Sequence, residues 1–221
     1  GDGTIIRYAK RAAADGKPLL GINAGRVGYL ANIEQSEYKL LEKLKTHEYT
    51  LEERMMLHIT VKENGRVINE FDALNDAVVT SGYISRIIDI TASVDGGDII
   101  SYHADGLILS TPTGSTAYNL SNGGPIIIPQ SGSLCLTPVA PHSLNIRPIV
   151  INDTAEIVLD VESRSHNYLV AIDGRSERMT EQTRLIIRKA PHSIKIVKQR
   201  NQRYFSTLRE KLMWGADQRQ R

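Results

Sequence analysis

The stretch "DGLILSTPTGSTAYNLSNGGPIII", residues 105–128, joins two apolar runs through a connection rich in glycine and hydroxyl residues. The first run, Leu107 to Leu109, is typical of a buried strand, and the second extends from Ile126 to Ile128. Pro112 and Gly114 indicate a turn between them. The stretch therefore predicts a fold in which buried strands carry a polar connection that offers backbone amides and hydroxyls.

Strand patterns continue on both sides of this stretch. From Arg54 to about Lys198, short runs of alternating polarity are separated by turn residues, as in "AEIVLDVE", "NYLVAID", "TRLIIRK" and "SIKIVKQ". In "IIDITASV", residues 87–94, apolar side chains recur at every second position, which is the period of a half-buried strand. Asn64-Gly65 marks a hairpin turn between two such runs. The middle of the chain is thus predicted to be an antiparallel β domain.

The beginning of the chain has a different pattern. The opening "GDGTIIRYAKRAAADGKPLLGIN" predicts a helix that Thr4 caps and Asp15-Gly16 stops. A buried strand is expected from Leu19 to Ile22, and a second helix from Tyr38 to Lys45. These elements are half of an α/β unit.

The end of the chain returns to helical spacing. In "RYFSTLREKLMWG", we expect Phe205, Leu208 and Leu212 on one side of a helix. The predicted fold class is mixed α+β: a partial N-terminal α/β domain, a β-rich, sandwich-like antiparallel C-terminal domain, and a C-terminal helix that packs back on the α/β domain. The expected boundaries are residues 1–48, 49–198 and 199–221.

Composition limits the partners and the compartment. The chain has 221 residues, of which 27 are basic and 25 acidic, so its formal charge of +2 offers no overall attraction to nucleic acid or to an anionic membrane. Its single cysteine, Cys135, excludes an internal disulfide and fits a reducing compartment. No apolar stretch approaches the roughly 18 residues of a membrane span. We expect a cytoplasmic protein that binds neither nucleic acid nor membrane.

The first four residues, "GDGT", combine flexible glycines with a carboxylate at the start of a helix. A helix N-terminus offers free N–H groups and partial positive charge, which suit phosphate. A carboxylate beside phosphate repels it unless the carboxylate holds a divalent cation or accepts the proton of an attacking hydroxyl. Asp2 is accordingly a candidate catalytic group, and a turn without function is the alternative.

The connection after Leu109 supplies a second candidate element. The segment "STAYNLS" predicts a helix start with Ser115 or Thr116 at its cap. Hydroxyls and amides suit the polar edges of a ligand, and Tyr118 could stack on a ring or cover a sugar. The alternative is a tight strand-to-helix connection that requires small residues.

A third candidate element lies in "ALNDAVV", residues 73–79, where Asn75 and Asp76 interrupt an apolar run. Buried polar groups are costly unless they are satisfied, so this pair either braces a loop or meets a ligand with hydroxyls. A carboxylate that accepts hydrogen bonds from ribose hydroxyls is one such arrangement. Arg86 and His103 are nearby basic residues that could contact phosphates, although each could equally be a surface charge.

Several standard motifs are absent from the sequence. It contains no G-x-x-x-x-G-K-S/T loop, no H-E-x-x-H, no C-x-x-C and no G-x-S-x-G, and Gly21, Gly25 and Gly28 are spaced wrongly for G-x-G-x-x-G. The P-loop, zinc-hydrolase, serine-hydrolase and Rossmann interpretations therefore lose their support.

Taken together, "GDGT", "GINAGRVGYL", "NDAVV" and "DGLILSTPTGSTAYNLSNGGPII", in this order, resemble the NAD kinase family. The resemblance extends over most of the chain, and the "TPTGSTAY" element distinguishes it from lipid kinases and phosphofructokinases, which share "GDGT". It implies transfer of a phosphoryl group from ATP or polyphosphate to the 2′-hydroxyl of the adenosine ribose of NAD, giving NADP. It also implies a divalent cation, expected to be Mg²⁺, and a homodimer or homotetramer.

The resemblance assigns roles to individual positions. It makes Asp2 the catalytic carboxylate, and makes residues 1–48 the phosphate-binding domain and 49–198 the NAD-binding domain. The substrate and nucleotide contacts that it implies are Gly3, Asn75, Asp76, Arg86, His103, Asp105, Thr116, Ala117, Tyr118, Ser121 and Ala140. Tyr29 stands where the family commonly has Phe.

Alternatives to this function remain at the level of sequence. A regulatory module could bind NAD or NADP without catalysis. A lipid kinase is disfavoured, because the sequence has no amphipathic segment for reaching lipid. The chain lacks an initiating Met and the first glycine of the family's G-G-D-G-T motif, so we expect it to be part of a longer protein.

Overall fold

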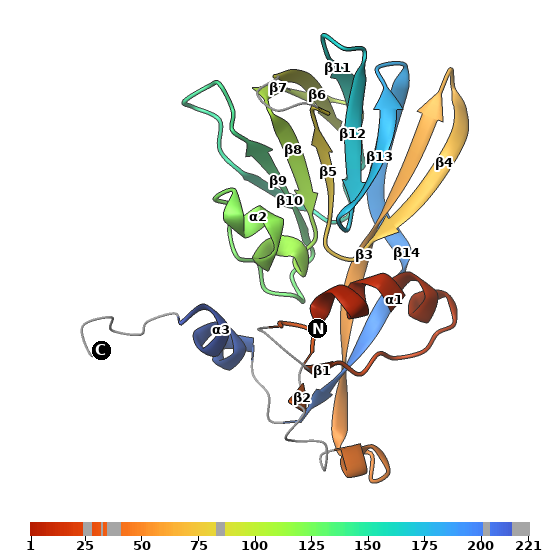
Figure 1. Ribbon diagram of the computed structural model, residues 1–221, viewed down its shortest axis with the longest axis vertical. Coiled ribbons are helices and arrows are strands. Elements are labelled where there is room, and N and C mark those ends of the chain that lie inside the picture. The colour runs from red at the N-terminus through yellow and green to blue at the C-terminus, as the bar shows by residue number, and fades with distance from the viewer. Residues whose placement is uncertain (24–27, 32, 35–40, 83–86, 201–203, 214–221) are drawn as a thin grey trace, which may run out of the picture. The chain divides into compact units, whose positions relative to one another are not determined.

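The computed structural model describes the chain except for residues 24–27, 32, 35–40, 83–86, 201–203 and 214–221 (Figure 1). The chain divides into two compact units. Unit 1 comprises residues 1–54 and 194–221, and unit 2 comprises residues 55–193. The long strands β3 (Tyr49–Glu63) and β14 (Thr183–Gln199) contribute residues to both units.

Unit 1 begins with helix α1 (Asp2–Ala14), which buries Ile5, Ala9 and Ala12 along one side. The N-cap is Gly1, three residues before the predicted cap at Thr4, and the Thr4 amide already donates to the Gly1 carbonyl oxygen at 3.1 Å. Its predicted end is confirmed: the amide of Asp15 closes the last turn on the Arg11 carbonyl.

Short strands complete the described part of unit 1. Strand β1 (Ile22–Asn23) pairs in parallel with β2 (Ile33–Glu34), and Leu19 forms an isolated parallel bridge with Ile196. The predicted helix at 38–45 is replaced by a 3₁₀ turn over residues 41–44, and residues 38–40 lie outside the described residues.

The C-terminal helix α3 (Tyr204–Leu212) confirms the predicted helical segment, and the predicted inward face is found in part. Leu208 is buried and Leu212 half-buried, as expected, whereas Phe205 is 63% exposed and Thr207 is buried in addition. None of the described helices is long and apolar enough to cross a membrane.

Two six-stranded sheets make up the β-rich part of the chain (Figure 1). The first has the order β10-β9-β8-β5-β12-β13 and the second the order β4-β3-β14-β11-β6-β7. The remaining strands are β4 (Arg66–Ala73), β5 (Asp76–Thr80), β6 (Ile88–Val94), β7 (Asp98–Ala104), β8 (Gly106–Ser110), β9 (Ser133–Val139), β10 (Ile149–Asn152), β11 (Ile157–Glu162), β12 (Asn167–Ile172) and β13 (Arg175–Thr180). The predicted antiparallel, sandwich-like domain is confirmed.

The core of unit 2 is one apolar cluster that takes side chains from both sheets, including Ile59 and Ile90 from one and Leu107 and Leu136 from the other. The alternation predicted for residues 88–94 is present, with Ile88, Ile90 and Ala92 buried and Asp89 and Thr91 exposed. Asn64 and Gly65 have φ of 50° and 79° in the β3–β4 hairpin, as the turn prediction requires.

Strand β8 is buried at every position because both its faces are covered. Leu107 and Leu109 belong to the core cluster, and the helix α2 (Tyr118–Ser121) contacts the strand. The connection that follows β8 thus folds back over the sheet. Gly114 permits this return, because a Cβ there would lie 2.2 Å from the backbone oxygen of Asn75.

We expect Gly114→Ala to lower the free energy of unfolding by about 2–3 kcal/mol, since the added methyl group would have to push two backbone segments apart. Gly97→Ala is the control, because a Cβ at Gly97 would meet nothing within 4 Å. We expect the control to change stability by less than about 0.5 kcal/mol. Urea unfolding of both variants measures these changes. Equal midpoints for Gly114→Ala and Gly97→Ala would contradict the expected clash at position 114.

Candidate functional site

A cavity of about 310 Å³ lies in unit 2 against one face of the first sheet, where alternate residues of β5, namely Asp76, Val78 and Thr80, line it. Four of the predicted site residues, Asn75, Asp76, Ala117 and Tyr118, line it together. The other lining residues are Val78, Thr80, Val139, Ala171, Asp173 and Gly174. The structure therefore brings the "NDAVV" segment and the "STAY" segment to one cavity, as the sequence predicts.

Asp173 holds the Asn75 segment in place. Its carboxylate accepts hydrogen bonds from three consecutive backbone amides, those of Leu74 and Asn75 at 2.8 Å and that of Asp76 at 3.2 Å. The Asp173 amide donates in return to the Asp76 carbonyl oxygen at 3.1 Å. Asp173 itself has φ of 48°, a conformation that Asp and Asn tolerate better than most residues. One side chain thus accepts from all three of these amides.

Asp173 is not among the residues predicted from the sequence, because "AIDGR" is typical of an ordinary Asp-Gly turn at the end of a strand. The pairing of strands gives it its role. Strand β12 runs antiparallel to β5 with Ile172 opposite Ala77, so the residue after β12 meets the residues that begin β5. The available signal was a carboxylate at a strand end, and only the register shows which amides it reaches.

The connection after β8 fixes the same segment from its other side. The Thr111 hydroxyl donates to the Leu74 carbonyl oxygen at 2.6 Å, and the Thr111 amide donates to the Asn75 carbonyl oxygen at 2.9 Å. The Gly114 amide donates to the Thr111 hydroxyl at 3.1 Å, which closes the turn. Asn75 and Asp76 therefore enter the cavity from a backbone that is held on both sides.

Most hydroxyls of the connection support its backbone instead of facing the cavity. Ser110, Thr111 and Ser115 are fully buried. The Ser115 hydroxyl donates to the Pro112 carbonyl and accepts from the Ile127 amide at 3.0 Å, so Ser115 ties the two ends of the connection together. Neither Ser115 nor Thr116 caps a helix, because the helix is broken into a 3₁₀ turn (Gly114–Thr116) and α2. The connection whose hydroxyls were expected to meet a ligand is thus largely an internally bonded scaffold.

Asp76 is the buried charge of the cavity. It is 6% exposed, and within the described residues no donor reaches its carboxylate. Burial raises the pKa of Asp76 to about 7, and the nearby Asp173 carboxylate adds to the effect. Burial also raises the pKa of Asp173, against the opposing effect of its three amide donors and Arg175. The Asp76 carboxylate therefore has acceptor positions that the described residues leave open for the donors of a ligand.

The other described residues that were predicted to contact the nucleotide in unit 2 do not line this cavity. Thr116 directly precedes the lining residue Ala117, Ser121 follows the lining residue Tyr118 by three positions, and Ala140 directly follows the lining residue Val139. Asp105 is tied to its neighbours by its backbone, which accepts from Ser81 and Thr80 and donates to Val139. Arg86 lies outside the described residues.

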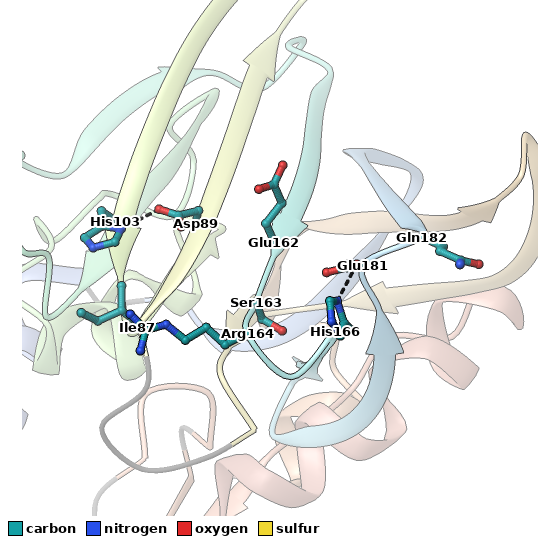
Figure 2. A pocket seen from close by; sticks show the side chains of 9 residues that line it. All are labelled: Ile87, Asp89, His103, Glu162, Ser163, Arg164, His166, Glu181 and Gln182. Carbon is teal, nitrogen blue, oxygen red and sulfur yellow. Dashed lines mark hydrogen bonds and ion pairs between the residues drawn. The ribbon is translucent and has the colours of Figure 1, made fainter.

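His103 lines a second, larger cavity of about 970 Å³ (Figure 2). There its Nδ1 lies 2.5 Å from an Asp89 carboxylate oxygen, and its ring meets that of His142 edge-on at 5.6 Å. The two cavities share no lining residue. The structure thus separates His103 from the Asn75 cavity, and its contact with a nucleotide stays a prediction.

Asp2 occupies a defined position within unit 1. Its carboxylate accepts hydrogen bonds from the backbone amides of Tyr29 at 2.5 Å, Leu30 at 3.1 Å and Ala31 at 3.0 Å. A Cβ at Gly28 would lie 2.5 Å from an Asp2 oxygen, so the glycine permits this approach. A carboxylate offers about four acceptor positions, and these amides take three of them. Asp2 is thus fixed in orientation and keeps an acceptor position for another donor.

Gly3, the second residue predicted to meet phosphates, lies in the first turn of α1. A Cβ at this position would meet nothing within 4 Å, so contacts within the described structure do not require a glycine here. Among the described residues, no group of three or more His, Cys, Asp or Glu side chains could hold a metal ion.

Family models match both parts of the chain. A model of the ATP-NAD kinase N-terminal domain matches residues 1–49, and a model of the ATP-NAD kinase C-terminal domain matches residues 74–199. An NAD kinase from Bacteroides fragilis is 52% identical over 220 residues, covering 99% of this chain and 76% of the relative. An NAD kinase from Porphyromonas gingivalis is 41% identical over 217 residues, covering 98% of this chain and 74% of the relative.

Two solved structures resemble the chain in three dimensions. A yeast NADH kinase complexed with NADH has a TM-score of 0.90 and 23% identity, covering 98% of this chain and 66% of the yeast chain. At that identity the likeness shows the fold alone. An NAD kinase from Archaeoglobus fulgidus in complex with ATP has a TM-score of 0.75 and 28% identity, covering 96% of this chain and 80% of the archaeal chain.

The raised pKa of Asp76 predicts that one substitution stabilises the protein at high pH and not at low pH. The folded protein binds the Asp76 proton up to about pH 7, whereas an unfolded Asp releases it near its ordinary value of 3.8, so stability from this group falls as pH rises between the two. Asp76→Asn mimics the protonated side chain. We expect it to raise the free energy of unfolding at pH 8 by up to about 4 kcal/mol and to change it little at pH 4. The free energies of unfolding of the wild type and of Asp76→Asn at pH 8 and pH 4 test this expectation. An equal change at both pH values would contradict the role assigned to burial.

Proposed function

Because the chain belongs to the NAD kinase family, we infer that it phosphorylates NAD, with ATP as the phosphoryl donor. The acceptor that we propose is the 2′-hydroxyl of the adenosine ribose, and the product NADP. The observation that carries this proposal is the unit 2 cavity, which gathers Asn75, Asp76, Ala117 and Tyr118 around an unsatisfied buried carboxylate.

We assign the adenosine half of NAD to this cavity. Its volume of about 310 Å³ lies at the lower end of the range for small-molecule sites, which suits part of a dinucleotide. Ribose hydroxyls would give the Asp76 carboxylate the donors that it lacks, and the Tyr118 ring, which is 47% exposed, would stack on the base or cover the sugar. Asn75 offers both a donor and an acceptor for the edges of the base.

We assign the phosphate chemistry to unit 1. Phosphoryl transfer depends mainly on alignment and on charge stabilisation. The first turn of α1 offers free amides to phosphate oxygens, and Asp2 accepts the proton of the attacking hydroxyl at its remaining acceptor position. The amides of Tyr29, Leu30 and Ala31 keep that carboxylate in one orientation, so alignment does not depend on a mobile side chain.

The proposed cation is Mg²⁺, which usually keeps several waters and is held by one or two carboxylates together with substrate phosphates. The described residues contain no group of three or more carboxylate, histidine or cysteine side chains that could hold the ion, so phosphate oxygens of the donor and water would supply most of its ligands. When bound, Mg²⁺ would neutralise charge on the phosphoryl donor.

The proposal has three further parts. Polyphosphate is a second phosphoryl donor, the protein forms a homodimer or homotetramer, and it is located in the cytoplasm.

A non-catalytic NAD-binding regulatory module is the alternative that the relatives do not favour, since they are named NAD kinases. The two functions differ in one product. The full-length protein, given ATP, Mg²⁺ and NAD, should generate NADP that a coupled NADP-specific dehydrogenase detects. Binding of NAD without any NADP would support the regulatory module.

We expect Asp2→Asn in the full-length protein to lower turnover by about 10²- to 10⁴-fold, the usual contribution of a general base. NAD affinity should be retained, because the residues assigned to NAD lie in unit 2. Steady-state turnover and equilibrium binding of NAD measure the two effects. Unchanged turnover would remove Asp2 from the chemistry, and a parallel loss of NAD binding would show damage beyond the carboxylate.

The affinity for NAD should depend on the protonation of Asp76. A carboxylate that accepts from ribose hydroxyls binds best when ionised, and the pKa of Asp76 is about 7 in the free protein. We therefore expect affinity to fall by up to about 10-fold between pH 8 and pH 6. Asp76→Asn should bind more weakly at pH 8 and show no such slope. Calorimetric titration of both proteins decides, and an equal slope in the variant would assign the titration to another group.

A further inference from the structure

The Thr80 hydroxyl is a polar group of the unit 2 cavity to which the proposed function assigns no role. Thr80 is the last residue of β5, and it lines the cavity together with Asp76 and Val78. These residues alternate along the strand, so their side chains lie on one face of the sheet, whereas Val79 belongs to the core cluster on the other face. The Thr80 side chain therefore lies on the same side of the strand as the Asp76 carboxylate.

The proton of the Thr80 hydroxyl is already used by the protein. The hydroxyl oxygen lies 3.1 Å from the Asp105 carbonyl oxygen and 3.4 Å from the Ser81 carbonyl oxygen. A carbonyl oxygen only accepts hydrogen bonds, so the single hydroxyl proton points to one of these two neighbours. The lone pairs of the Thr80 oxygen receive no hydrogen bond from the described residues. Toward the cavity, this hydroxyl is thus an acceptor and not a donor.

The neighbouring strand leaves the Thr80 hydroxyl uncovered. Thr80 pairs with Gly106 of β8, and Gly106 pairs in turn with Val139 of β9. Thr80 and Val139 both line the cavity, so the cavity extends over the Gly106 backbone. A Cβ at Gly106 would lie on the same face as the Thr80 side chain and only 3.3 Å from its Cβ. The missing side chain at Gly106 therefore keeps the hydroxyl accessible from the cavity.

Apolar side chains lie between the two polar ends of the cavity. Val78 separates Asp76 from Thr80 along β5. Its partner on β12 is Ala171, which also lines the cavity. An isopropyl group and a methyl group suit the flat face of a ring and offer no hydrogen bond to its edges. The cavity thus has an acceptor at each end and an apolar surface between them.

The spacing of the two acceptors suits a nucleoside. Asp76 and Thr80 are four residues apart on a strand, which corresponds to about 13 Å. Two hydrogen bonds of about 3 Å each leave roughly 7 Å between the donor groups of a ligand that lies along the strand. A ribose hydroxyl and the exocyclic amino group of adenosine are separated by a distance of this order. Adenosine therefore carries donors that can meet both acceptors at once.

We propose that Thr80 is a specificity-determining residue whose hydroxyl oxygen accepts a hydrogen bond from the exocyclic amino group of adenine. This inference deepens the proposed function and rests on it, because it takes the adenosine half of NAD as the occupant of the cavity. Hypoxanthine has a carbonyl oxygen in place of the amino group, so it would set an acceptor against an acceptor. Thr80 thus selects a 6-amino purine over a 6-oxo purine, while Asn75 is left for other positions on the edge of the base.

The test measures how strongly the protein distinguishes two dinucleotides. Calorimetry on the full-length protein gives the Kd of NAD and of its analogue with hypoxanthine in place of adenine, for the wild type, Thr80→Val and Thr80→Ser. We expect the wild type to bind NAD about 10- to 100-fold more tightly, because a polar group left without its partner is costly. Thr80→Val keeps the shape and removes the acceptor, so it should lower this ratio about 5- to 10-fold. Thr80→Ser keeps the hydroxyl and should retain the ratio.

The substitution to valine leaves the neighbouring backbone satisfied. The Asp105 carbonyl oxygen still accepts from the Ser81 amide at 3.2 Å when the Thr80 hydroxyl is removed. Thr91→Val is the matched control, because Thr91 is exposed on β6 and lines neither cavity. We expect it to leave both Kd values unchanged. An equal ratio in the wild type and Thr80→Val, or an equal fall of the ratio in Thr91→Val, would overturn the proposal.

An assay of NADP formation on the same proteins separates this inference from the proposed function. A wild type that forms NADP but binds both dinucleotides equally would refute the role of Thr80 and leave the kinase function intact. A wild type that forms no NADP, but whose preference for NAD falls in Thr80→Val, would support the role of Thr80 and refute the kinase function. A wild type that binds neither dinucleotide would refute both, because the cavity would not be an NAD site.

Discussion

The contact between the Asp173 carboxylate and the backbone amides of residues 74–76 is the interaction on which the unit 2 site depends. It places a buried negative charge against three N–H groups, so the amides that begin β5 are satisfied without a further strand partner. The segment between β4 and β5 is therefore fixed at the start of β5, an interior strand of the first sheet, and Asn75 and Asp76 line the cavity from a rigid base. Without this carboxylate, three buried donors would lack acceptors.

The same arrangement explains why the site is costly for the fold. Asp76 and Asp173 are both largely buried, and burial raises the pKa of each of them. The Asp173 charge raises the pKa of Asp76 further. A protein selected only for stability would not keep such a pair. Residues 110–124 compensate in part, because Thr111, Ser115 and Asn119 bond the backbone of the connection and of its neighbours. The hydroxyl-rich connection gives the cavity a rigid wall, and only Ala117 and Tyr118 from this segment line it.

Unit 1 uses backbone amides in a similar way. Asp2 accepts from three consecutive amides, as Asp173 does, and Gly28 makes room for its oxygen. In both units a carboxylate thus fixes a short loop, and the loop fixes the carboxylate. The two units differ in the surrounding charge. In unit 2, burial and then the Asp173 carboxylate raise the pKa of Asp76, whereas in unit 1 burial lowers the pKa of Lys198 and the Glu52 and Asp2 carboxylates oppose that change.

The sequence by itself determined the antiparallel β domain, the hairpin at Asn64-Gly65 and the segments that hold the site, because alternation and turn residues are local signals. It also indicated Asn75, Asp76 and Tyr118, since polar or aromatic residues that interrupt an apolar pattern are visible without coordinates. Only the tertiary structure decided that Asp173 binds residues 74–76, that Ser115 ties a loop instead of capping a helix, and that His103 lines a different cavity. These features depend on strand register and on contacts between residues as much as 99 positions apart, and no local pattern of side chains encodes such distances.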